Sequence, residues 1–455
     1  MIEGDRVLRV ERRGGARDVQ SRHDLGDVLI GPGFIDLDAL SDLDTTVLGI
    51  DNHPAWKKGR VWPDTYIQAG PCEMYSPAEL AFQKRFAFAQ LLLNGITSAL
   101  PIASLFYREW GETVEEFEAA AQAAADLGLR VWLGPAYRSG GMRVDASGAL
   151  HPMFDEARGL RGLREAAAFA KRVHGSHDGL VSGMFAPDRV ETSTAELLKQ
   201  TFIHAEDLDV PVRLHMAQGE MERNAVQQLY GMTAPQWLNG MGLLRSRLIA
   251  PHATHATDKD LALYAEHGVT VAHCPLVSAR GGGALRSFSK LRKMGVRIGM
   301  GTDTAPPDMV LNMSLGLIAA RIAEGRNDAS SCAEFYDAAT LAGAQALGRA
   351  DLGRIAAGSK ADIAVFDMAD AYIAPTIDPI QTLVYGASGR VARATLVDGR
   401  LVMRDGRVAG MDMAAARMQA QAQYDRLVRR YPERTWGHPP VGEIFPPSYP
   451  HPQGW

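Results

Sequence analysis

Cysteine is scarce in this chain, and long apolar runs are missing. The three cysteines, Cys72, Cys274 and Cys332, are odd in number and far apart in the sequence, so we expect neither a disulfide framework nor a cysteine-based zinc site. No segment reaches the roughly 20 apolar residues that a membrane-spanning helix needs, and the first residues lack a signal-peptide pattern. We therefore expect no membrane association and a cytoplasmic location.

Positive charge is not in excess either. The formal net charge is -5, and lysine and arginine form no obvious cluster, so nucleic acid is not an expected partner. The contents of 46% hydrophobic and 22% charged residues are typical of a globular protein. A chain of 455 residues has room for a large barrel and a smaller accessory unit. We expect a homo-oligomer that acts on a small molecule.

Strand-like and helical patterns alternate through most of the chain. Apolar runs such as 96–100, 130–133 and 212–214 are separated by alanine-rich helical stretches, for example 113–127, and the alternation continues to 296–300. Strands separated by helices indicate βαβ units, and this many of them favour a closed (β/α)8 TIM-like barrel. Both chain ends have strand patterns without helices, which predicts a small β-sandwich built from the two ends together.

This pattern divides the chain into four segments. They are the first part of the β-sandwich (1–30), the barrel (31–351), the second part of the β-sandwich (352–410), and a helix with a proline-rich tail (411–455).

Polar residues follow the predicted barrel strands where the catalytic end of such a barrel lies. His215, His252, His273 and Asp303 each end an apolar run, and His255 follows three residues after His252. Imidazole and carboxylate groups bind zinc, iron, cobalt or manganese, and a catalytic site needs about three protein ligands with one position left open. His215, His252 and Asp303 are suited to this, and Asp303 is also suited to accept a proton from the attacking water.

The same residues lie in motifs that resemble the amidohydrolase superfamily, specifically the branch with cytosine deaminase, S-adenosylhomocysteine deaminase and the triazine hydrolases. The resemblance covers nearly the whole chain, and its motifs are 31–36, 215–218, 252–255, 272–275, 301–303, 353–362 and 397–400. It implies one divalent metal ion, with zinc favoured and manganese, iron or cobalt as alternatives. It also implies that His215 and His252 are ligands, that Asp303 is both ligand and proton shuttle, and that His273 contacts substrate or water. We include His255 in this catalytic group.

The first barrel strand departs from the family pattern, in which it ends in His-x-His. Here Asp38 and Leu40 stand at those two positions. Leucine cannot bind a metal, whereas the Asp38 carboxylate can, and we expect Asp38 to be a fourth ligand. A carboxylate in place of an imidazole makes the site harder, which favours manganese or iron more than the usual pattern does. Because Leu40 cannot bind a metal, a barrel that binds no metal and is not catalytic is an alternative interpretation.

A second departure is Gln218, where the deaminases have a glutamate that protonates the substrate ring. An amide has no titratable proton to give, so we favour hydrolysis of a C–N bond in an amide, urea or carbamate, or a related bond in an apolar molecule. Gln218 is then a substrate-binding residue that donates or accepts a hydrogen bond. The alternative is a heterocycle deaminase, which would need Glu220 or another acid to supply the proton.

Three further residues are predicted to bind substrate. Arg138 follows a predicted strand and is placed to polarise a carbonyl oxygen, although a salt bridge is an equally good interpretation. Trp56 and Trp62 belong to a long aromatic loop that indicates a lid or pocket wall, or else a dimer contact.

Overall fold

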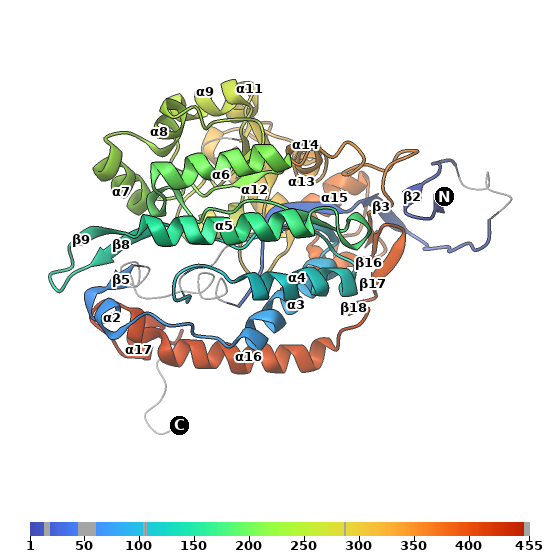
Figure 1. Ribbon diagram of the computed structural model, residues 1–455. Coiled ribbons are helices and arrows are strands. Elements are labelled where there is room, and N and C mark those ends of the chain that lie inside the picture. The colour runs from blue at the N-terminus through green and yellow to red at the C-terminus, as the bar shows by residue number, and fades with distance from the viewer. Residues whose placement is uncertain (13–18, 44–60, 103–104, 106, 286–287, 450–455) are drawn as a thin grey trace.

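The computed structural model describes residues 1–12, 19–43, 61–102, 105, 107–285 and 288–449 (Figure 1). Its centre consists of two four-stranded parallel sheets. The first contains, in spatial order, β10 (Val181–Gly183), β7 (Arg130–Leu133), β6 (Ile96–Pro101) and β4 (Phe34–Ala39). The second contains β11 (Val212–Arg213), β12 (Leu248–Pro251), β13 (Thr270–His273) and β14 (Arg297–Met300).

The two sheets approach each other at both edges. Phe185 and Val212 form a parallel bridge beside β10 and β11. At the other edge, the backbone N–H of Asp303 donates to the carbonyl of Asp38 at 2.7 Å. Two groups of four parallel strands, each with continuous strand pairing, are consistent with the predicted TIM-like barrel.

Helices follow the strands and cover the outside of this core (Figure 1). Most begin at a side chain that accepts from the helix backbone, such as Ser76 before α3 and Thr113 before α4. The helices of this layer are α3 (Pro77–Leu93), α4 (Val114–Leu127), α5 (Glu156–Val173), α6 (Ala195–Leu208), α7 (Glu220–Tyr230), α8 (Ala234–Gly240), α9 (Asp258–His267), α10 (Pro275–Arg280), α11 (Phe288–Lys293), α12 (Met309–Glu324), α13 (Cys332–Ala339) and α14 (Leu341–Ala346).

The two chain ends share one antiparallel sheet. Its order is β18 (Arg407–Val408), β17 (Arg400–Arg404), β16 (Ala392–Val397), β15 (Ile363–Asp367) and β3 (Val28–Pro32). Strand β3 continues after Gly33 into β4, so the first barrel strand is anchored to this sheet at its start. A short ladder of β1 (Ile2–Glu3) and β2 (Arg6–Val7) lies beside it, and α15 (Pro379–Gly386) precedes β16. The predicted second layer of a sandwich remains a prediction.

Two further elements lie against the barrel. One is a three-stranded sheet of β5 (Trp62–Pro63), β8 (Gly140–Val144) and β9 (Leu150–Phe154), with α2 (Asp64–Ala69) following β5. The other is the C-terminal helix α16 (Met413–Arg430), which runs along α3 (Figure 1) and is joined to it by a 3.0 Å hydrogen bond from Gln83 to Gln423. The short α17 (Val441–Ile444) follows within the predicted proline-rich tail.

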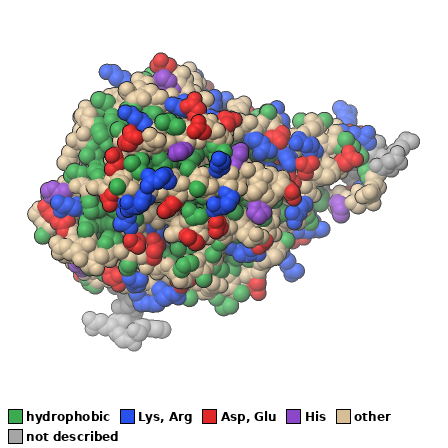
Figure 2. Space-filling model, in the orientation of Figure 1, with side chains coloured by type: hydrophobic (Ala, Val, Ile, Leu, Met, Phe, Trp, Pro, Cys, Tyr) green, Lys and Arg blue, Asp and Glu red, His purple; other side chains and the backbone are tan. Residues whose placement is uncertain are grey.

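The visible face carries acidic and basic side chains intermixed, without one large field of either sign (Figure 2). Among the described residues, no helix combines the length and the apolar character needed to cross a bilayer.

Candidate metal centre

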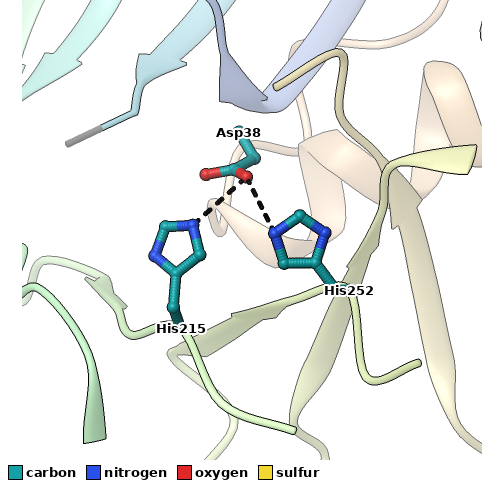
Figure 3. A group of neighbouring side chains, drawn as sticks. All are labelled: Asp38, His215 and His252. Atoms are coloured by element: carbon teal, nitrogen blue, oxygen red, sulfur yellow. Dashed lines mark ion pairs between the residues drawn. The ribbon is translucent and has the colours of Figure 1, made fainter. Parts of the chain in front are cut away.

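Asp38, His215 and His252 meet at the carboxyl ends of the central strands (Figure 3). The Asp38 carboxylate extends from β4, and its Oδ2 lies 3.5 Å from His215 Nε2 and 3.9 Å from His252 Nε2. Asp303 follows β14, with Oδ2 3.4 Å from His252 Nε2. All four side chains are buried. The structure therefore brings together the four residues that the sequence predicted as a ligand group.

The backbone is unusual at two of these residues. His252 has a φ of 71° and Asp303 a φ of 61°, both in the left-handed region that residues other than glycine rarely adopt. Such conformations cost on the order of 1–3 kcal/mol and cluster at functional sites. Both residues lie just beyond a strand, where this turn aims the side chain at the group instead of along the sheet. The local strain is an observation in favour of function.

The polar atoms of this group are poorly satisfied within the protein. His252 is 1% exposed, and neither of its ring nitrogens has a hydrogen-bond partner. His215 Nε2 has none either. Buried polar atoms are normally paired. Imidazole nitrogens and carboxylate oxygens with this spacing are the donor set of a divalent cation, so the residues fit the metal that the sequence motifs imply.

Electrostatics keep the donors in the form that binds a cation. Burial lowers the pKa of His252 to about 3 and also lowers the pKa of His215, so both rings are neutral at neutral pH. For Asp38, burial acts to raise the pKa, but the interaction with His215 and the positive charge of Arg213 outweigh burial and hold the pKa at about 2. Neutral imidazoles and an ionised carboxylate are what metal coordination requires.

Arg213 is the permanent positive charge beside Asp38, and the sequence analysis did not identify it. Its Nη1 lies 3.5 Å from Asp38 Oδ1 and donates to the backbone carbonyls of Leu100, at 3.1 Å, and Pro101. The side chain is 1% exposed. A signal was available, because Arg213 lies two residues before His215 at the end of a predicted strand, where alternation turns both side chains to one face.

Asp36 is a buried carboxylate that accepts from the backbone N–H of Asp38 at 3.2 Å. Burial raises its pKa to about 7, even though Thr302 donates to it from its backbone N–H at 3.0 Å and from its hydroxyl at 2.5 Å. These bonds join the end of β4 to the segment after β14 and so fix Asp38 relative to Asp303.

Cys274 also lies beside the group, although spacing along the sequence indicated no cysteine-based zinc site. Its Sγ is 3.8 Å from Asp38 Oδ2, and Cys274, His252 and Asp303 offer ligand atoms that all lie within 4.8 Å of one another. Burial raises the pKa of this thiol in the absence of a cation. Spacing along the sequence could not reveal the site, because only one of its residues is a cysteine.

His273 does not join this group. Its ring centroid lies 6.2 Å from that of Phe288 and 6.4 Å from that of Phe335, and it lines a small cavity near Gly316. Burial lowers its pKa to about 3. Cys274, the residue after β13, lies beside the metal group, whereas its neighbour His273 points to the helix layer. His255, partly exposed, belongs to neither candidate ligand group, and its backbone N–H donates to Ala217 at 2.8 Å.

Gln218 lies at the side of the site, held by neighbours. Its Oε1 accepts from Arg189, and its backbone N–H donates to Glu222 at 2.8 Å. Arg189, which the sequence analysis missed, forms a bridge with His215 through the backbone. Burial raises the pKa of the nearby Glu191 to about 8, so this acid is protonated at neutral pH.

Arg138 occupies an aromatic environment. Its guanidinium carbon lies 4.6 Å from the ring centroid of Trp62 and 5.1 Å from that of Trp110. Its Nε and Nη2 are buried without a hydrogen-bond partner, and burial lowers its pKa to about 10. Trp56, the other predicted aromatic, lies outside the described residues.

Central parallel strands, a surrounding helix layer and polar side chains at the carboxyl ends of the strands are typical features of α/β-barrel enzymes. The family model for the amidohydrolase family matches residues 32–402, and the chain belongs to this family. This confirms the family that the sequence motifs predicted, and with it an amidohydrolase-type hydrolase that acts on carbon–nitrogen bonds.

Two curated relatives illustrate the similarity. A 5-methylthioadenosine/S-adenosylhomocysteine deaminase of Halobacterium salinarum is 30% identical over 381 residues, which are 83% of this chain and 81% of the relative. An enzyme of the same name from Desulfitobacterium hafniense is 26% identical over 421 residues, which are 90% of each chain.

Solved structures share the fold. An adenosine deaminase from Xanthomonas campestris with bound zinc has a TM-score of 0.73 at 23% identity, covering 88% of this chain and 86% of the other. Atrazine chlorohydrolase TrzN from Arthrobacter aurescens, complexed with zinc, has a TM-score of 0.74 at 20% identity, covering 93% of this chain and 94% of the other. These similarities support a TIM-like barrel.

Proposed function

We propose that Asp38, His215, His252 and Asp303 hold one divalent metal ion, with zinc favoured over manganese, iron or cobalt, and that this site hydrolyses a C–N bond in a small molecule. The observation that carries the proposal is the buried His252 ring, whose Nε2 faces two carboxylates without a hydrogen-bond partner. When bound, such an ion supplies a Lewis acid and a hydroxide nucleophile at neutral pH.

The protein's own residues perform the remaining steps. Asp303 accepts the proton of the attacking water on its carboxylate and donates it to the nitrogen of the leaving group. Arg213 holds Asp38 in its ionised form, and Asp36 with Thr302 keeps the ends of β4 and β14 in register. We assign His273 a packing role, because its ring contacts the aromatic side chains of the helix layer.

Gln218 indicates which class of substrate the site can hydrolyse. Its side-chain oxygen accepts from Arg189, so the amide is engaged within the protein and has no acidic proton to donate. This favours a bond that needs proton donation only to the leaving nitrogen, as in an amide, urea or carbamate. Trp62 and Arg138 are proposed to line the substrate pocket, since Arg138 has two buried N–H donors available for a carbonyl oxygen.

Deamination of a heterocycle is the second candidate. It is favoured by relatives that are named as deaminases. Glu220, which begins α7, is exposed. Glu191 retains a proton at neutral pH and interacts electrostatically with Arg189, the residue that donates to Gln218. In this candidate Glu191 supplies the proton that Gln218 cannot.

Metal analysis and a substrate panel test the proposal. Protein grown with zinc, manganese, cobalt and iron should retain about one equivalent of metal, whereas less than about 0.2 equivalents would support a barrel without metal. Anilides, aryl ureas and carbamates should release an amine. Ammonia release from adenosine, guanine or cytosine analogues, without amine release from the first set, would replace the favoured function with the second candidate.

A further inference from the structure

We infer that Cys274 is a metal ligand that supplies, as a thiolate, the donor that Leu40 cannot supply. The inference rests on the proposed function, because it concerns the same metal centre. It adds sulfur to a donor set of nitrogen and oxygen and so changes which metals the site prefers.

The distances suit coordination. Cys274 Sγ lies 3.8 Å from Asp38 Oδ2. Bonds of about 2.3 Å to sulfur and 2.0 Å to oxygen place two tetrahedral ligand atoms about 3.5 Å apart. The ligand atoms of Cys274, His252 and Asp303 lie within 4.8 Å of one another. His252, unpartnered and 1% exposed, belongs to both candidate groups, so one ion at this point can contact sulfur, nitrogen and oxygen.

The strand next to Cys274 is shaped to admit the thiol. A Cβ added to Gly301 would lie 2.8 Å from Cys274 Sγ and 2.9 Å from Asp38 Cβ, both closer than real Cβ contacts allow. The glycine after β14 therefore leaves the space that the thiol and Asp38 share. Cys274 is 0% exposed, so this space is closed to solvent.

Leu40 explains why another donor is needed. It is 1% exposed and packs in the main apolar core together with Phe88 and Phe117. Of the two positions that carry histidine in the family pattern, only Asp38 can thus bind a metal. A thiolate from β13 restores a ligand and makes the site softer, which favours zinc or cobalt over manganese. The Asp38 carboxylate alone would have the opposite effect.

Cobalt substitution tests this ligand directly. A thiolate bound to Co²⁺ gives an intense sulfur-to-metal charge-transfer absorption in the near ultraviolet, which nitrogen and oxygen ligands do not give. We expect this band in the Co²⁺-loaded protein and its loss in Cys274→Ser. Cys72→Ser and Cys332→Ser are matched controls, because these are the other two cysteines of the chain, and both should keep the band.

Metal affinity and thiol protection give two further readouts. Cys274→Ser and Cys274→Ala should weaken Zn²⁺ binding at least about tenfold, since even groups outside the coordination shell have effects of that size. Because Cys274 is buried, its alkylation requires local opening of the protein. Bound Zn²⁺ should slow this alkylation in the wild-type protein, with peptide mapping to identify the site. Circular dichroism of the variants separates a lost ligand from a lost fold, and Cys274 protection in the wild type does not depend on any variant.

The outcomes separate the two proposals. If Co²⁺ binds stoichiometrically without the charge-transfer band, and Zn²⁺ leaves Cys274 alkylation unchanged, Cys274 is not a ligand and the proposed function stands. If neither ion binds the wild-type protein, the metal centre itself is refuted.

Discussion

The ion pair of Arg213 and Asp38 predicts that Arg213→Met lowers the stability of the metal-free protein much more than that of the metal-bound protein. In the metal-free protein, Arg213→Met leaves a fully buried carboxylate without the cation 3.5 Å away, and it removes the donor to the carbonyls of Leu100 and Pro101. Bound metal offers Asp38 a second cation. We therefore expect the substitution to destabilise the metal-free protein more than the metal-bound one.

The magnitude follows from the burial of the pair. Removing one partner of a buried ion pair costs about 3–5 kcal/mol. An unfolding entropy of about 2.1 cal/mol/K per residue gives roughly 1 kcal/mol/K for the 455 residues. The Tm of metal-free Arg213→Met should thus be about 3–5 °C below that of the metal-free wild type. The double variant Arg213→Met/Asp38→Asn should recover at least half of this loss, because the uncompensated charge is gone.

Calorimetry of chelator-treated and zinc-loaded protein measures these differences. Arg247→Met is the matched control, since Arg247 pairs with Asp209 at 2.7 Å but its side chain is 35% exposed. An exposed pair contributes about 0–1 kcal/mol, so the Tm of the control should change by about 1 °C or less. If metal-free Arg213→Met has the same Tm as the Arg247→Met control, Arg213 does not stabilise the Asp38 carboxylate. The same conclusion follows if the double variant is no more stable than Arg213→Met.

Three other predictions concern single residues of the site. Asp303→Asn should abolish turnover while circular dichroism stays unchanged, and a near-normal rate would remove Asp303 from the mechanism. Gly301→Ala should lower zinc affinity at least about tenfold in a chelator competition, because the added Cβ would lie 2.9 Å from Asp38 Cβ; unchanged affinity would show that this contact relaxes freely. Burial lowers the pKa of His273 to about 3, so below pH 6.5 only the unfolded chain takes up this proton and stability falls. Between pH 7 and pH 5 the wild type should lose about 2 kcal/mol that His273→Leu does not lose, and parallel stability curves for the two proteins would contradict this.

The arrangement of strands was predictable because each barrel strand is an apolar run followed by a polar residue. The predicted strand at 130–133 coincides with β7, and the predicted helix 113–127 corresponds to α4. The same rule selected His215, His252 and Asp303, which the structure brings together. Parallel strands carry their ends to one edge of the barrel, so residues far apart in sequence meet there.

The rest of the site depends on which face each side chain occupies, and the sequence analysis did not follow that alternation far enough. Arg213 ends β11 and His215 follows two residues later, and both side chains lie beside Asp38. Beyond β13, Cys274 points to the metal group, while His273 contacts Phe335 in the helix layer. The position of Arg189 beside Gln218 depends on a loop conformation, which no periodic pattern encodes.

Together, these positions explain how the first strand can depart from the family pattern and still contribute to a metal centre. Asp38, in place of the histidine of the family pattern, adds a negative charge to a buried site. Burying an uncompensated charge costs several kcal/mol. Arg213 supplies the opposite charge within 3.5 Å. Leu40, in place of the second histidine, removes a donor. The Cys274 thiol lies close enough to the other ligand atoms to replace this donor on the same ion. The two replacements in the first strand therefore depend on Arg213 of β11 and on Cys274 after β13. Asp38→His alone should place an imidazole beside Arg213, which then lacks its carboxylate partner, and should lower the metal affinity of the site.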